Sequence, residues 1–210
     1  MRIDCGSYVT SHDQKGDTFE RLVSTFFGDV IHPRIGTHNF ILAIQNAQYL
    51  EAVCPVNNPL TDSTTFGEAV SQRAAEGDGW LTWLVAIDTI STIKKRLGHE
   101  VIDGHGTKPD RKDLAWSQIG VQGTLKDEQI PFFIELLLLD QPSKDGKAIA
   151  KIVKVEIAGD ESRMEEWLGS ELHETIGSDV EVEWDTAAIE GESGIVSVPV
   201  ITPCGVVRLE

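Results

Sequence analysis

Three parts of the sequence repeat one order of signals: a strand-like segment, then a capped amphipathic helix, then further strand-like segments. An aspartate marks the start of each helix and a glycine its end, the usual N-cap and C-cap residues. The pairs are Asp17 and Gly28, Asp88 and Gly98, and Asp160 and Gly169. Apolar residues recur at helical spacing within each pair. The repetition predicts three β-α-β-β-β units in one chain.

Each unit alone is too small to bury both faces of its own sheet. Two units paired into one curved mixed sheet, with the helices outside, would share a core. We therefore expect an α+β fold of paired modules around a central cavity, with a third, module-like C-terminal segment. The expected boundaries are 1–58 for the first module, 59–78 for a connector helix, 79–141 for the second module and 148–210 for the C-terminal segment.

The composition excludes several classes of protein. The formal net charge of -16 repels phosphate backbones and anionic membranes, so we expect neither nucleic acid nor a membrane as a partner. Solubility is the simpler reason for that charge. The three cysteines lie far apart and fit neither a disulfide framework nor a structural zinc module. With no signal peptide or membrane span in the sequence, we predict a cytoplasmic protein.

Two carboxylates stand in apolar segments. Glu135 interrupts the run Pro131–Leu139, which is short, is entered through a proline and is rich in aromatic residues, as buried strands are. Glu51 has a similar setting in QYLEAVCP, and Glu210 ends the chain in a Leu-Glu pair that could also come from a cloning site. A buried carboxylate needs a partner, a metal ion or a proton. We predict a metal ligand or general base at Glu135 and Glu51; the alternative is a strand-end acid paired with Arg or Lys.

The order of the elements, together with the segments MRID, GTHNFIL, YLE and PFFIE, resembles the glyoxalase-like proteins of the vicinal oxygen chelate superfamily. The resemblance covers residues 1–140 and implies a divalent metal, such as zinc, nickel, manganese or iron, held by the first and last strands of both modules. Glu51 and Glu135 match the last-strand positions. Cys5 stands where many relatives have a histidine. The matching position of the second module falls at Thr82 or Trp83, neither of them a usual ligand, so the metal could equally be lost.

The same resemblance suggests residues that line the cavity. His38 and Asn39 begin a strand there, and His38 is a further candidate metal ligand. Trp83 and Trp116 lie on strands of the second module, where aromatic walls suit a flat or apolar ligand. Ordinary core packing is the alternative for both tryptophans, and a hydrogen bond to a loop carbonyl is the alternative for His38.

Two functions remain open on the sequence alone. One is a metal-dependent lyase, isomerase or dioxygenase, in which the metal chelates two oxygens of a small substrate while Glu135 or Glu51 moves a proton. The other is a non-catalytic protein that binds or sequesters a small molecule, as drug-resistance proteins do, after loss of the metal. A small molecule is the expected partner in both cases, and the chain could be a monomer or a homodimer.

Overall fold

The computed structural model describes residues 1–10, 29–32, 36–45, 48–56, 61–107, 113–137, 148, 150–176, 180–185, 193–203 and 205–210. The helix predicted from Asp17 to Gly28 lies outside these ranges. Within them, no helix combines the length and the apolar composition of a membrane-spanning segment.

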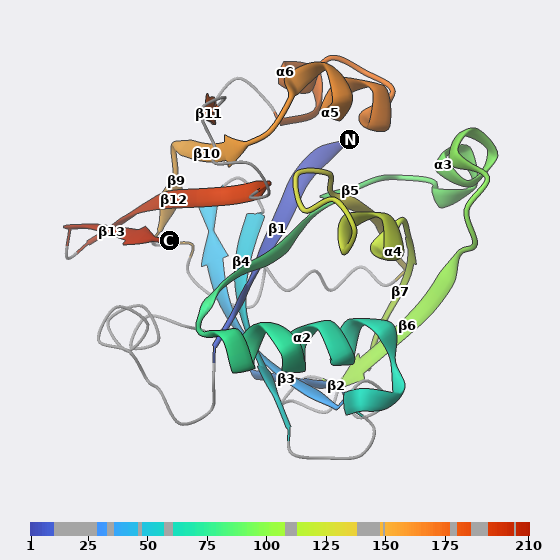
Figure 1. Ribbon diagram of the computed structural model, residues 1–210, viewed down its shortest axis with the longest axis horizontal. Coiled ribbons are helices and arrows are strands. Elements are labelled where there is room, and N and C mark those ends of the chain that lie inside the picture. Colours follow the sequence, from blue (N-terminus) through green and yellow to red (C-terminus); the bar gives the residue numbers. More distant parts are fainter. Residues whose placement is uncertain are drawn as a thin grey trace.

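Eight strands form a closed barrel in the order β1-β4-β3-β2-β6-β7-β8-β5 (Figure 1). The first module supplies β1 (Arg2–Val9), β2 (Asp29–His32), β3 (Thr37–Ile44) and β4 (Gln48–Pro55), and the second supplies β5 (Gly79–Ala86), β6 (Ile102–Thr107), β7 (Asp113–Ile119) and β8 (Phe132–Leu136). In each module the first strand pairs in parallel with the last. The modules join where β1 pairs with β5 and where Ile31 pairs with Thr107. The predicted pairing of two modules is confirmed.

Five α-helices lie within the described ranges, and they differ in how they are capped. They are α2 (Thr65–Glu76), preceded by the 3-10 turn η2 (Thr61–Ser63), then α3 (Ile90–Leu97), α4 (Val121–Thr124), α5 (Glu161–Leu168) and α6 (Leu172–Ile176). Asp160 caps α5 as predicted, accepting a hydrogen bond from the Ser162 amide, and Gly169 ends that helix. The cap predicted at Asp88 is wrong, because Thr89 is the N-cap residue of α3 and its side chain makes no cap bond.

The C-terminal segment forms a second sheet. Its strands are β9 (Lys151–Ile152), β10 (Lys154–Ala158), β11 (Glu181–Asp185), β12 (Gly194–Thr202) and β13 (Gly205–Leu209), in the order β11-β10-β12-β13, with β9 paired to β12. Apart from the short β9 and α6, its succession of a strand, a helix and three strands is that of a module. The pairing differs, because β10 lies parallel to the next strand, β11, whereas each barrel module pairs its first strand with its fourth. The segment is therefore module-like in element order and distinct in topology.

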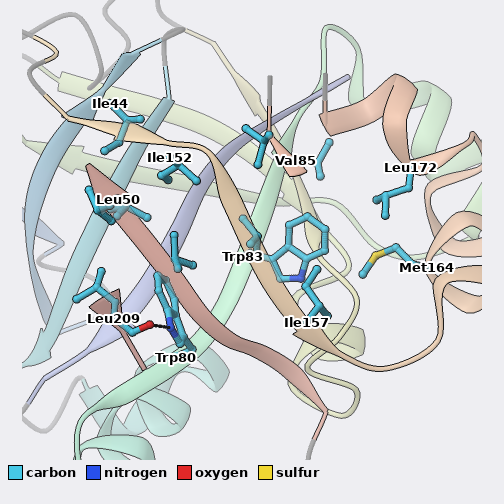
Figure 2. Packing of buried hydrophobic residues seen from close by; sticks show 14 of the residues in the cluster. Ile44, Leu50, Trp80, Trp83, Val85, Ile152, Ile157, Met164, Leu172 and Leu209 are labelled. Carbon is cyan, nitrogen blue, oxygen red and sulfur yellow. Dashed lines mark hydrogen bonds between the residues drawn. The ribbon is translucent and has the colours of Figure 1, made fainter. Parts of the chain in front are cut away.

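The largest apolar cluster joins this second sheet to the outer face of the barrel. Figure 2 shows Trp80 and Trp83 of β5 beside Ile157, Met164 and Leu209 of the C-terminal segment. Trp80 Nε1 also donates to the Leu209 carbonyl oxygen at 3.3 Å. The C-terminal segment therefore shares one core with the barrel.

A second cluster lies on the inner face of the barrel wall. Its buried members come from β3, β4, β5, β7, β8 and α4: Ile41, Tyr49, Leu84, Leu114, Trp116, Val121, Phe132 and Ile134. Neighbours along one strand alternate between the two clusters, since Phe132 and Ile134 belong to the inner one and Phe133 to the outer one. This alternation tells which side chains of each strand point into the barrel.

Candidate functional site

Three polar side chains from neighbouring strands meet inside the barrel. Ser7 Oγ on β1 donates to Glu51 Oε1 on β4 at 2.5 Å, and Asn39 Nδ2 on β3 donates to Glu51 Oε2 at 2.9 Å. Ser7 is fully buried and Asn39 is 2 % exposed. Glu51 is half-buried. We call Ser7, Asn39 and Glu51 the Glu51 cluster.

The strand register produces this cluster. Ser7 stands opposite Glu51 in the parallel pair of β1 and β4. Ile41 stands opposite Glu51 in the antiparallel pair of β3 and β4, which puts Asn39, two residues away, on the same face. Tyr49, two residues before Glu51, belongs to the inner apolar cluster. The Glu51 cluster is thus a polar group set among apolar residues inside the barrel.

One buried atom of the cluster has no hydrogen-bond partner among the residues that the structure describes. A carboxylate can only accept, so Asn39 must present its NH₂ group to Glu51, which fixes the orientation of the amide. The other amide atom, Asn39 Oδ1, is buried and has no partner among the described residues. Nearly all buried polar atoms in proteins are paired, so Asn39 Oδ1 is the atom of the cluster that can accept a further hydrogen bond.

Trp116 is the largest side chain of the inner cluster. Its Nε1 donates to Gln118 Oε1 at 3.1 Å, and its ring covers Gly104 on β6, which stands opposite it in the sheet. A Cβ atom at Gly104 would lie 2.1 Å from Trp116 Cε2. The glycine therefore leaves room for the ring.

Replacing Gly104 by alanine is expected to displace the Trp116 ring and to destabilise the protein by about 1–3 kcal/mol, the usual cost of overpacking. Chemical denaturation would give the free energy of unfolding. Gly77→Ala is a control without crowding, because nothing lies within 4 Å of a Cβ there, although its φ of 125° adds backbone strain. An unchanged stability in Gly104→Ala would contradict the packing described.

Glu135 does not join Glu51. It alternates on β8 with Phe132 and Ile134, which point into the barrel, and its Oε2 accepts a hydrogen bond of 2.7 Å from the Ile90 amide. Ile90 is the first residue of α3, so Glu135 supplies the cap that the helix lacks from Thr89. The two predicted catalytic acids thus lie on opposite faces of the barrel wall.

The other predicted site residues divide in the same way. His38 alternates with Asn39 and lies against Phe40, with the two ring centroids 4.5 Å apart. Trp83 belongs to the outer cluster and donates from Nε1 to the Gln129 carbonyl oxygen at 3.0 Å. The backbone of Cys5 pairs with Tyr49 and Leu84, and its side chain lies outside the described part of the structure. Of the predicted pocket residues, Asn39 and Trp116 are on the inner face.

Among the side chains that the structure describes, the donor set does not fit the metal centre that the resemblance implies. On the second module, the inner face of β5 and β8 carries Thr82, opposite Ser7, with Leu84, Phe132 and Ile134. None of these side chains is a usual metal ligand. Across the described ranges, no group of three His, Cys, Asp or Glu side chains is placed to hold a metal ion. Glu51 is the predicted ligand that the structure places inside the barrel.

The sequence matches the model of one protein family. A family model described as a glyoxalase-like domain matches residues 9–173. The chain belongs to this glyoxalase-like family. Membership places it in the vicinal oxygen chelate superfamily, so the resemblance seen in the sequence is confirmed. No curated protein matches the chain.

The glyoxalase-like match covers part of the site only. Asn39 and Glu51 fall inside the matched range, and Ser7 precedes it. Sequence analysis predicted the first two and missed Ser7, because a small hydroxyl residue in a strand carries no charge or period that sets it apart. The available signal was that Ser7 lies two residues after Cys5, which was predicted to face the cavity. Side chains two residues apart on a strand point to the same face.

Proposed function

We propose that this glyoxalase-like protein binds a small molecule at the Glu51 cluster, through hydrogen bonds and without a metal ion. The observation that carries the proposal is the buried, unpartnered Asn39 Oδ1 beside a carboxylate. A few converging polar groups within an apolar wall are typical of ligand sites. Glu51 keeps part of its surface exposed, so a ligand can reach it.

Each residue of the cluster has a role in this proposal. Ser7 and Asn39 each donate to one oxygen of the Glu51 carboxylate and so hold it in a fixed position. Trp116 and Tyr49 supply apolar surface for the body of the ligand.

A metal-independent lyase or isomerase is the second candidate function. The fixed position of Glu51 favours it, because a carboxylate held by two donors can accept a proton from a bound carbon acid as a general base. Catalysis would then use the same cluster and the same ligand site.

A thermal-shift screen of small polar metabolites would test the proposal. In EDTA, a ligand at about 100 times its Kd adds about 2.7 kcal/mol of stability, which is several degrees for a chain of this size. We expect the screen to find compounds that raise the Tm of the wild-type protein in EDTA. The same compounds should leave the Tm of Asn39→Leu unchanged. Glu135→Gln, on the outer face, is the matched control and should respond like the wild type.

Two outcomes of this screen would contradict the proposal. Compounds that act only after addition of zinc, nickel, manganese or iron(II) would favour the metal-dependent function predicted from the resemblance. Compounds that act equally on wild type and Asn39→Leu would place the ligand elsewhere.

A further inference from the structure

We infer that the ligand of the Glu51 cluster presents a hydrogen-bond donor to Asn39 Oδ1, so that its binding group is an amide, amidine, amine or hydroxyl. This inference rests on the proposed function and adds the chemical class of the ligand. It differs from what the resemblance implies, since a chelated substrate would offer oxygen acceptors.

The side-chain donors of the cluster are directed at Glu51. The Ser7 hydroxyl has one hydrogen and donates it to Glu51 Oε1. Asn39 turns its NH₂ group toward Glu51 Oε2. The atom left without a partner is therefore an acceptor, Asn39 Oδ1.

The chemistry of Asn39 Oδ1 limits which ligand groups can lie beside it. A ligand carboxylate or ketone would place an acceptor oxygen against Asn39 Oδ1, and neither oxygen could be satisfied. A buried polar atom without a partner weakens binding strongly, whereas an N–H or O–H group would pair with it. The formal net charge of -16 adds a long-range preference against anionic ligands.

Three probes of one shape would test this inference. Benzamidine, benzamide and benzoate share a phenyl ring and differ in their head groups. The benzamidine head group carries only hydrogen-bond donors, that of benzamide carries donors and an acceptor, and that of benzoate carries only acceptors. Isothermal titration of the wild-type protein should show benzamidine and benzamide binding at least about tenfold more tightly than benzoate. Benzoate binding as tightly as benzamidine would overturn the inference.

The variant Glu51→Gln gives a sharper result. Its new side-chain amide can donate to Asn39 Oδ1, so the Asn39 amide can turn and present its NH₂ group to the ligand. We expect the preference to reverse, with benzoate binding more tightly than benzamidine. Glu135→Gln makes the same change of charge on the outer face and should keep the wild-type preference. Loss of the Glu51 charge alone would also favour benzoate, so the double variant Glu51→Gln/Asn39→Leu separates the two causes: the reversed preference should be absent from it if Asn39 carries the preference, and should persist if Asn39 is merely structural.

The outcomes separate this inference from the proposed function. Probe binding that persists in Asn39→Leu would overturn both, because the ligand would lie elsewhere. Binding that is lost in Asn39→Leu but is tightest for benzoate would overturn the donor class alone. Absence of binding by all three probes would also overturn the donor class, while metabolites that depend on Asn39 would still support the function.

Discussion

Replacing Trp83 by alanine is expected to destabilise the protein by about 3–5 kcal/mol, the usual loss for a large buried aromatic side chain. Trp83 is 2 % exposed and belongs to the cluster that joins the barrel to the C-terminal segment. The variant also leaves the Gln129 carbonyl oxygen without its indole donor. Chemical denaturation, followed by circular dichroism, would give the free energy of unfolding.

Two further variants separate the contributions of Trp83. Trp83→Phe keeps an aromatic ring and loses the hydrogen bond, so we expect a smaller loss, about 1–3 kcal/mol. Trp184→Ala, at a half-buried position on β11, should cost less than Trp83→Ala. A stable Trp83→Ala protein with weakened ligand binding would contradict this assignment and place Trp83 in the ligand pocket.

Much of the fold could be predicted because it depends on local signals. The Asp160 and Gly169 caps and the apolar face between them are short-range features, and α5 lies where they indicate. How sheets join is set by contacts between distant segments, which no local pattern reveals. The barrel closes through the Ile31–Thr107 pair, and β10 pairs with β11 rather than with the last strand of its segment.

The site was harder to predict because it depends on which face of a strand each residue takes. On β8, Phe132, Phe133 and Ile134 are apolar on both faces, so the period of two that would orient Glu135 is missing from the sequence. A shift of one residue moves a side chain to the other face. The adjacent residues His38 and Asn39 show the same effect, since only Asn39 lies with Glu51.

Replacing Glu51 by leucine is expected to destabilise the protein by about 2–5 kcal/mol, because two buried donors lose their acceptor at once. Ser7 and Asn39 both donate to this carboxylate, and neither is exposed enough to turn to water instead. Denaturant unfolding of Glu51→Leu beside the wild type would measure the loss. Glu51→Gln, which keeps an acceptor oxygen, should lose less.

Removing the donors as well should restore most of that stability. In the Glu51→Leu background, Ser7→Ala and Asn39→Leu replace unpaired polar groups by apolar ones, which can be nearly neutral. A double-mutant cycle would then show a coupling of about 0.5–3 kcal/mol between Glu51 and Asn39, as expected for residues of one hydrogen-bond network. Additive losses would contradict the network.

The single variant Asn39→Leu tests both the stability of the hydrogen-bond network and the binding of the ligand. It removes one donor to Glu51 and also the unpartnered acceptor Oδ1, so its stability should lie close to that of the wild type or above it. A variant that is as stable as the wild type and yet binds no ligand would show that the chain keeps a destabilising buried oxygen because the bound ligand pairs with it. A large loss of stability would instead assign Asn39 to holding the barrel together.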